Sequence, residues 1–210
     1  MEFLKDGHYF NVLPEADGFW NKFISGDWEL ETLKAIKSRL NLKTDFIDIG
    51  AWCGPTAIWA SYFCNHVFAF EPDNLAYANL IANIYTSKRS NITAVRAALS
   101  VDNKDVTVSS VGPMGFSISN TIGMGKPGNI ARALTIADIF HMFNITNICL
   151  FQMDIEGAEF SILPSCLKLL GPTKIPLHIS FHAPLLLENR YNLDYEIKII
   201  LDLIDKFYND

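Results

Sequence analysis

Short apolar runs alternate with amphipathic stretches along most of this chain. The apolar runs predict strands at 46–49, 67–70, 92–98, 147–153 and 177–182. Between them, apolar residues recur at spacings of three and four, which is typical of helices with one buried face. These stretches lie at 28–40, after 55, after 73, at 136–143, up to 170 and at 185–208. Strands that alternate with helices predict an α/β fold with a doubly wound, mostly parallel sheet.

Residues with strong positional preferences mark the ends of several helices. Pro55 suits the first turn of a helix, because the N–H that proline lacks is not needed there. Asp27, Asp73 and Thr135 are predicted caps, since short polar side chains accept hydrogen bonds from the free N–H groups of a first turn. Gly171, with the proline that follows it, predicts a helix end.

The first part of the chain has no clean periodicity. Residues 1–26 are rich in aromatic side chains, and we expect them to cover the main domain, with one short strand near 8–13. Together with the first helix they form a predicted N-terminal segment, residues 1–40. The main domain is predicted to comprise residues 41–210.

A second irregular region follows the third predicted strand. A turn at 102–104 leads into an apolar stretch at 105–109, which predicts a hairpin. Residues 111–129 are rich in glycine, proline and serine. A loop of this length inside a compact domain is usually functional, so we expect a lid or an acceptor-binding loop.

The composition narrows the class of protein and of partner. A net charge of −6 and the lack of clustered lysine and arginine argue against a nucleic-acid partner. No apolar run reaches the roughly 18 residues of a membrane span, and the N-terminus does not resemble a signal peptide, so we expect a cytoplasmic protein without a membrane partner. The 4 cysteines lie in apolar segments without a C-x-x-C pair, which indicates buried free thiols. The oligomeric state is not predicted.

The stretch from Asp45 to Asp73 predicts a nucleotide site. A dinucleotide fingerprint that begins at Gly50 would need glycine where the chain has Trp52 and Pro55. The missing second glycine disfavours NAD and FAD, because that glycine lets the backbone approach a pyrophosphate. A ligand with a ribose and no phosphate fits better, since Glu71 at the end of the second strand can accept both ribose hydroxyls. S-adenosylmethionine is such a ligand.

Three motifs carry a family resemblance: DIGAWCG at 48–54, FEPDNLAYANL at 70–80 and MDIEGAE at 153–159. Over roughly residues 28–182, the chain resembles the FkbM-type S-adenosylmethionine-dependent methyltransferases. The resemblance implies a class I methyltransferase fold and methylation of a hydroxyl, often on a sugar or a secondary metabolite. The usual class I sheet ends in a hairpin for which too few residues remain. Either the sheet is shortened at that edge or the N-terminal segment completes it.

The cofactor contacts follow from the turn and the resemblance together. Asp48 and Gly50 are expected at the methionine end, and Glu71 at the ribose diol. The other expected contacts are the loop Ala51, Trp52, Cys53 and Gly54, then Pro72, and Ala98 beside the adenine. Trp28 and Glu29 could border the same site, although core packing alone also explains the tryptophan.

The candidate catalytic residues follow the fourth and fifth predicted strands. Asp154 and Glu156 come after the fourth strand, and His182 is the predicted proton acceptor because it ends the fifth strand, nearest the loops. His178 alternates with His182 and should share its face. Alternatively, the carboxylates only stabilise a helix N-terminus and the histidine is structural. The same residues could hold a divalent ion, but the sequence places no third carboxylate, so no metal is predicted.

The predicted function is O-methylation of a hydroxyl on a saccharide or small secondary metabolite, with S-adenosylmethionine as the methyl donor. One alternative keeps the cofactor and changes the acceptor to nitrogen or a carboxylate. The D-P-P-Y or N-P-P-Y tetrapeptide of amide and adenine N-methyltransferases is absent, which disfavours nitrogen. A second alternative is a non-catalytic cofactor-binding or interaction module on the same fold.

Overall fold

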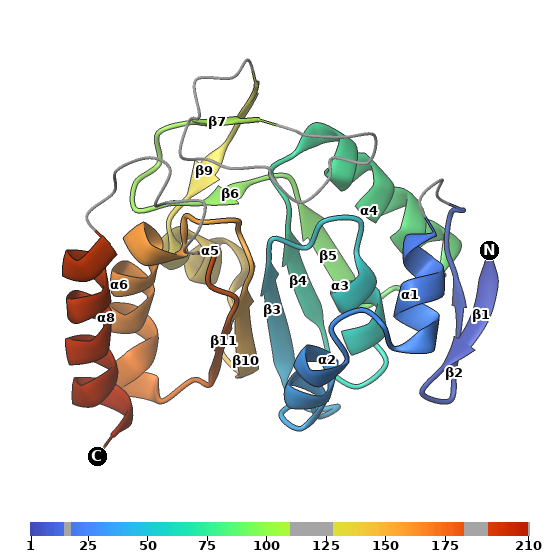
Figure 1. The fold of residues 1–210 in the computed structure, drawn as a ribbon, viewed down its shortest axis with the longest axis horizontal. Coiled ribbons are helices and arrows are strands. Elements are labelled where there is room, and N and C mark those ends of the chain that lie inside the picture. Colours follow the sequence, from blue (N-terminus) through green and yellow to red (C-terminus); the bar gives the residue numbers. More distant parts are fainter. Residues whose placement is uncertain (15–17, 110–127, 183–192, 210) are drawn as a thin grey trace.

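A five-stranded parallel sheet forms the centre of the molecule (Figure 1). The computed structural model describes residues 1–14, 18–109, 128–182 and 193–209. The sheet has the order β11-β10-β3-β4-β5. Its strands are β11 (Leu177–Ile179), β10 (Ile148–Met153), β3 (Asp45–Ile49), β4 (Val67–Phe70) and β5 (Ile92–Val95). The prediction of a doubly wound, mostly parallel sheet is confirmed.

The chain reverses its direction of travel across the sheet between β3 and β10. From β3 it proceeds outward to β4 and β5, and it later returns to pair β10 against the other side of β3. Ligands of open α/β sheets bind at such a switch point, beyond the carboxyl ends of the strands. Asp48 pairs with Gln152 in this register, so the ends of the two strands lie side by side.

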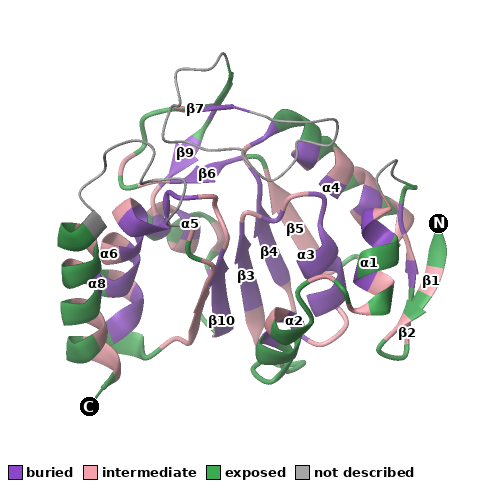
Figure 2. Ribbon diagram, viewed as in Figure 1, coloured by how far each residue is buried: buried purple, intermediate pink, exposed green. Residues whose placement is uncertain are grey.

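Helices cover both faces of the sheet, as the alternation of buried side chains requires. Ile47 and Phe151 belong to one apolar cluster, against α5 (Ile136–Phe143), α6 (Glu159–Leu170) and α8 (Leu193–Tyr208). Phe46 and Leu150 belong to the other cluster, with α1 (Phe19–Ser25), α2 (Leu30–Lys37), α3 (Pro55–Ala60) and α4 (Asn74–Thr86). Figure 2 shows the central strands almost entirely buried between these layers.

Most predicted helix ends are confirmed. Pro55 occupies the first turn of α3. Asp73 accepts hydrogen bonds from the N–H groups of Leu75 and Ala76 at the start of α4, and Thr135 forms a capping box with Asp138 on α5. Asp27 is not a cap: α2 begins later, after Glu29 in a left-handed conformation, and the Asp27 carboxylate accepts from Ser25 Oγ instead.

The N-terminal segment contains more structure than the sequence predicted. β1 (Glu2–Lys5) and β2 (His8–Asn11) form an antiparallel hairpin, followed by α1. Phe19, Trp20 and Phe23 lie on α1 and pack against one another. Their helical spacing was hard to recognise in the sequence because aromatic residues are frequent throughout this segment. The hairpin pairs only within itself among the described residues, so it does not complete the open edge of the main sheet at β11.

Two small strand pairs flank the main sheet. The third strand ends at Val95, where the Ala97 N–H donates back to the Val95 carbonyl and turns the chain. β6 (Ala98–Leu99) pairs in parallel with β9 (Ala133–Leu134), and β7 (Val106–Val108) pairs antiparallel with β8 (Asn129–Ala131). The predicted hairpin between the third strand and 105–109 is therefore wrong, because β7 finds its partner later in the chain.

Several remaining predictions concern segments near the ends of elements. A 3₁₀ turn, η1 (Gly171–Thr173), ends α6 as predicted. All four cysteines are buried, and none forms a disulfide among the described residues, as predicted. Most of the predicted loop at 111–129 lies outside the described residues, as does the start of the helix predicted at 185.

Among the described helices, none combines the length and apolarity needed to cross a bilayer.

Candidate active site

The turn after β3 is fixed to both neighbouring strands. The N–H groups of Gly50 and Ala51 both donate to the Phe70 carbonyl on β4, at 2.9 and 3.0 Å. Gly50 has a φ of +88°, and a Cβ built there would stand 1.8 Å from the Asp154 carbonyl oxygen, just beyond β10. Only glycine allows this approach, so the turn and the Asp154 segment are in direct backbone contact.

The Glu71 carboxylate lies where the sequence predicted an acidic group for a ribose. Its Oε2 accepts from the Trp52 N–H at 2.8 Å, and its Oε1 accepts from the Asp73 N–H at 2.8 Å. The residue is 5% exposed. Burial raises the pKa of Glu71 to about 7, although the two backbone N–H donors oppose that rise. The two N–H groups hold the carboxylate in one orientation at the end of β4.

Two polar side chains on adjacent strands have buried oxygens without a hydrogen-bond partner in the part of the chain that the structure describes. Asp48 is 1% exposed, and neither of its carboxylate oxygens has a hydrogen-bond partner among the described residues. Burial, reinforced by the negative charge of Asp154, raises the pKa of Asp48 to about 8. The Oε1 of Gln152, its neighbour on β10, also has no partner in the described part of the chain. Buried polar groups are rarely left unpaired, so both indicate a place where a ligand supplies the partners.

These groups line a single cavity of about 380 Å³, a volume typical of small-molecule sites. It lies above the carboxyl ends of β3, β4 and β10. The predicted site residues among its lining are Asp48, Gly50, Ala51, Trp52, Glu71, Pro72, Ala98, Asp154, Glu156 and His182. Segments far apart in the sequence therefore meet at one hollow, as an active site requires.

Two predicted contacts do not face this cavity. Cys53 is fully buried within the apolar cluster behind the turn. Gly54 begins α3, and a Cβ there would stand 2.7 Å from the Leu80 side chain. Both residues support the turn rather than line the cavity. By contrast, Trp28 and Glu29 do line it, as the sequence suggested they could.

The cavity also has lining residues that the sequence did not single out. Phe19 and Lys22 reach it from α1, on the same side as Trp28. Phe19 packs edge-on against Trp52, with ring centroids 4.6 Å apart. The available signal was the helical spacing of Phe19 and Phe23, ended by Gly26 in a left-handed conformation. The N-terminal segment thus forms one wall of the site.

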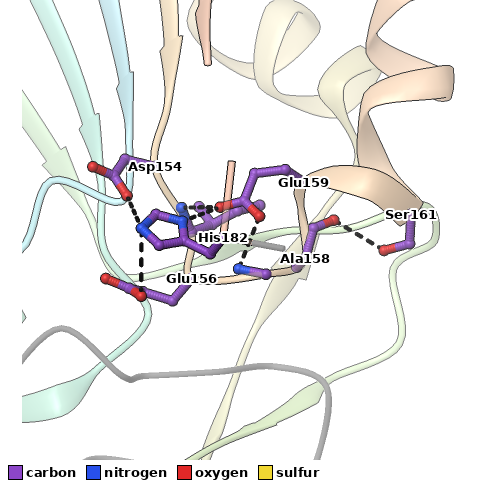
Figure 3. Close-up of polar contacts among 8 residues, drawn as sticks. Asp154, Glu156, Ala158, Glu159, Ser161 and His182 are labelled. Atoms are coloured by element: carbon purple, nitrogen blue, oxygen red, sulfur yellow. Dashed lines mark hydrogen bonds and ion pairs between the residues drawn. The ribbon is translucent and has the colours of Figure 1, made fainter. Parts of the chain in front are cut away.

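The three predicted catalytic side chains converge, as Figure 3 shows. His182 Nε2 lies 3.6 Å from Asp154 Oδ1 and 3.6 Å from Glu156 Oε2. On the other side of the ring, His182 Nδ1 lies 3.0 Å from Glu159 Oε1, within hydrogen-bond distance. We refer to Asp154, Glu156 and His182 as the carboxylate–histidine cluster.

Glu159 fixes the geometry of this cluster from the Nδ1 side of the imidazole ring. Its side chain is fully buried, and it accepts hydrogen bonds from the N–H groups of Ile155 and Gly157, at 3.0 and 2.8 Å. Glu156 and Gly157 both have positive φ, at 58° and 105°, so the chain folds tightly around the Glu159 carboxylate. One buried side chain therefore positions both the loop that carries the carboxylates and the imidazole ring.

The charges in the cluster shift each other's pKa. The hydrogen bond to Glu159, with the nearby Glu156 and Asp154, raises the pKa of His182 to about 9. Burial raises the pKa of Glu156 to about 7 and also raises that of Asp154, while His182 opposes both shifts. At neutral pH, the imidazole already carries a proton in this arrangement. Glu156 is then better suited than His182 to take up a proton near neutrality.

His178 does not join the cluster. The strand predicted at 177–182 ends at Ile179, so the alternation that would place both histidines on one face stops before His182. His178 lines a different cavity, beside α6 and α8. Burial lowers the pKa of its imidazole. The prediction that the two histidines share a face is wrong because the strand is shorter than its apolar pattern suggested.

Comparison with known proteins supplies a family. A family model described as "Methyltransferase FkbM domain" matches residues 48–198, from Asp48 on β3 into α8. This range includes the three motifs, the Glu71 carboxylate and the whole carboxylate–histidine cluster. No curated protein matches the chain.

Solved structures with a similar arrangement include several methyltransferases. An rRNA methylase from Streptococcus thermophilus has 8% identity and a TM-score of 0.45, with 76% of this chain and 75% of that chain covered. SMU.1697c from Streptococcus mutans, in complex with SAH, has 10% identity and a TM-score of 0.48, with 84% and 80% covered. Precorrin-6y C5,15-methyltransferase from Geobacter metallireducens has 13% identity and a TM-score of 0.45, with 86% and 72% covered. Identities this low say nothing about the substrate of this chain.

Proposed function

The chain belongs to the FkbM methyltransferase family, and from that premise we propose that it methylates a hydroxyl of a saccharide or small secondary metabolite. Its methyl donor is S-adenosylmethionine. The observation that carries the proposal is the position of the carboxylate–histidine cluster in the same cavity as Glu71 and Asp48. A donor seated on Glu71 and an acceptor seated on the cluster would therefore meet in one enclosed space.

The unpaired and preorganised groups support a position for the cofactor. Glu71 accepts the ribose hydroxyls, because backbone N–H groups already hold both of its oxygens in position. Asp48 accepts from the ammonium group at the methionine end, which gives its buried oxygens the partners that they lack. Ala98, on β6, borders the adenine. A cofactor held by these residues would have its activated methyl group in the cavity that the residues after β10 also line.

The acceptor hydroxyl then lies at the carboxylate–histidine cluster. When bound, S-adenosylmethionine would supply a methyl group already activated on sulfur: the acceptor oxygen would bond to the methyl carbon, and the electron pair of the carbon–sulfur bond would stay on sulfur. The hydroxyl proton passes to Glu156, whose pKa of about 7 suits exchange near neutrality. Protonated His182 stands beside the carboxylates and keeps them from repelling each other. Most of the rate enhancement comes from alignment of the two substrates, since the donor is already activated.

The experiment is an incubation of the full chain with methyl-labelled S-adenosylmethionine and a panel of saccharides and hydroxylated metabolites. We expect labelled methyl ethers and an equal amount of S-adenosylhomocysteine. Label that is released by mild alkali would reveal a carboxylate acceptor, and label on an amine would reveal a nitrogen acceptor; either result contradicts the proposal. Cofactor binding without any product across the panel would favour a non-catalytic module.

A further inference from the structure

Three side chains with metal-binding atoms meet on the wall of the cavity. One atom each from Asp154, Glu156 and His182 lies within 4.8 Å of the other two. We propose that this cluster binds a divalent first-row metal ion, Mn²⁺ or Zn²⁺, through His182 Nε2 and one oxygen of each carboxylate. From the sequence alone no third carboxylate was placed and no metal was predicted, but the fold adds features that the sequence did not show.

The distances in the cluster fit ligands around an ion better than hydrogen-bond partners. His182 Nε2 is 3.6 Å from both Asp154 Oδ1 and Glu156 Oε2. An N–H···O hydrogen bond spans about 2.7–3.2 Å, so neither contact is one. Nitrogen and oxygen ligands bind Zn²⁺ at about 2.0–2.2 Å, which places two ligands at a tetrahedral angle roughly 3.3–3.6 Å apart. The imidazole nitrogen and each carboxylate oxygen therefore already have the spacing of two ligands of one ion.

The histidine is already oriented as a ligand. His182 Nδ1 faces the buried Glu159 carboxylate at 3.0 Å, and backbone N–H groups hold that carboxylate in place. With the Nδ1 hydrogen donated to Glu159, the lone pair of Nε2 points toward Asp154 and Glu156. Metal-binding histidines in proteins commonly have a carboxylate behind them in this way, which fixes the tautomer and the ring.

A second, independent observation lies beside the cluster. Gln152, on β10 two residues before Asp154, is 4% exposed and lines the same cavity. Its Oε1 has no partner among the described residues. An acceptor oxygen buried this deeply calls for a donor, and a water bound to an ion at the cluster can be that donor. The ion thereby explains an unpaired group outside its own set of ligands.

The set of ligands indicates which ions fit. Mg²⁺ and Ca²⁺ bind oxygen ligands, and an imidazole suits them poorly. A mixed set of one imidazole and two carboxylates suits Mn²⁺ or Zn²⁺. Three protein ligands also leave a position for water or for a substrate oxygen, which is the pattern of catalytic rather than structural sites.

The role of this ion rests on the proposed function. A hydroxyl bound to a divalent ion loses its proton more readily than a free one, because the ion stabilises the oxyanion. With the ion in place, His182 Nε2 is a ligand and carries no proton. The ion and that proton are thus alternative cations for the same three side chains.

The test is a titration of the full chain with Mn²⁺, without cofactor or acceptor, followed by electron paramagnetic resonance. Bound Mn²⁺ loses the sharp signal of the free ion, and we expect one ion per chain, displaced by Zn²⁺. Asp154→Asn and His182→Asn should each weaken binding at least ~10-fold, and Glu159→Gln by about 10–100-fold through loss of ring orientation. His178→Asn is the matched control, because it makes the same replacement on β11, four positions before His182 and outside the cluster; it should bind like the parent protein.

Two results would overturn the metal site: no loss of signal in the parent protein at millimolar Mn²⁺, or equal binding in the Asp154→Asn and His182→Asn variants. Near-ultraviolet circular dichroism checks that each variant is folded, and Asp154→Asn, a nearly isosteric change, remains informative if His182→Asn does not fold. A protein that methylates hydroxyls without binding Mn²⁺ or Zn²⁺ refutes the ion alone. A protein that binds the ion at the cluster without methylating any hydroxyl refutes the proposed function alone.

Discussion

The two ends of the cavity are built in different ways. The cofactor end comes from one continuous stretch, β3 to the start of α4, in which backbone N–H groups hold Glu71 and glycine allows the turn. The acceptor end joins the segment after β10 to His182, and its side chains are held by one another and by Glu159. Local backbone geometry therefore determines the first end, whereas long-range side-chain contacts determine the second.

This difference predicts how each end responds to mutation. Changes at the cofactor end should alter binding of the cofactor, because those groups are the ones proposed to contact it in the ground state. Changes at the acceptor end should alter turnover and leave cofactor binding intact, because those groups act on the second substrate. The two ends are in direct backbone contact: the Asp154 N–H donates to the Ile49 carbonyl, and a Cβ at Gly50 would stand 1.8 Å from the Asp154 carbonyl oxygen.

The largest effect is expected at Glu156. Replacement by glutamine removes the proton acceptor while nearly preserving the shape of the side chain. We expect kcat to fall by roughly 10²–10⁴-fold, the usual contribution of a general base, with the cofactor dissociation constant unchanged. The measurements are labelled-methyl transfer and calorimetric titration with the cofactor.

Glu31→Gln is the matched control for that change, because Glu31 is an exposed glutamate on α2, 84% exposed, whose partner is Lys34. It should leave both kcat and cofactor affinity as they are. If Glu156→Gln weakens cofactor binding as much as it slows turnover, the acceptor end also contributes to cofactor binding, and the two ends do not have separate roles.

The next effect concerns the contact between the two ends. In Gly50→Ala, the new Cβ would stand 1.8 Å from the Asp154 carbonyl oxygen, so the backbone after β10 has to move. We expect a loss of roughly 3–4 kcal/mol in the free energy of unfolding, since overlap with backbone cannot be relieved by a rotamer change. Denaturant unfolding of the variant measures this loss.

Gly7→Ala is the control for Gly50→Ala. It measures the cost of a positive φ without the steric clash that the new Cβ would cause at Gly50. Gly7 has a similar φ of +83°, but nothing lies within 4 Å of a Cβ built there. It should lose only about 1–2 kcal/mol, the cost of a positive φ for a residue with a side chain. Equal losses in the two variants would show that the approach of the turn to Asp154 is not tight.

The sequence predicted the cofactor end better than the acceptor end, for the same physical reason. The residues at Gly50, Pro55, Glu71 and Asp73 act on backbone within a few positions of themselves, so their types already imply a turn, a helix start and a strand end. The structure confirms the predicted elements in that stretch and places most of the predicted contacts around one cavity. Cys53 and Gly54 were predicted as cofactor contacts only because they lie between such residues in the sequence. Neither of them lines the cavity.

Long-range partners explain what the sequence did not predict. Nothing in the spacing of β7 shows that its partner is β8, rather than the third strand. The separation of His178 from His182 depends on where β11 stops pairing with β10, which its neighbours decide. Glu159 looked like an ordinary first-turn acid of a helix, and its role as a support for both the loop and the imidazole is visible only once His182 is beside it.

A smaller effect is expected from the ribose carboxylate. Glu71→Ala should weaken cofactor binding by about 2–3 kcal/mol, because the ribose hydroxyls would lose their acceptor in a buried place. That corresponds to a roughly 30–150-fold higher dissociation constant. Glu71→Gln keeps one acceptor oxygen and should lose less. Calorimetry that finds unchanged affinity in Glu71→Ala would contradict the assignment of Glu71 to the ribose.

The smallest effect is a pH dependence of stability that originates at Asp48. Burial raises the pKa of this side chain to about 8 in the cofactor-free protein, and that of Glu71 to about 7. Between the ordinary pKa of a carboxyl and these values, the folded protein holds protons that the unfolded chain releases. The free energy of unfolding of the cofactor-free protein should therefore fall as pH rises from about 5 to 8.

Asp48→Asn removes the larger of these two contributions and should make the pH dependence shallower. Because the folded-state pKa of Asp48 is the higher of the two, we expect the variant to gain stability relative to the parent steadily as pH rises from 5 to 8. Its cofactor affinity should fall, because the ammonium group loses a negative partner. Asp202→Asn, at an exposed position on α8, is the control and should keep the slope of the parent. If the free energy of unfolding of the parent protein rises between pH 5 and 8 instead, Asp48 is charged and paired in the cofactor-free protein. That result would contradict its assignment as the unpaired acceptor for the ammonium group.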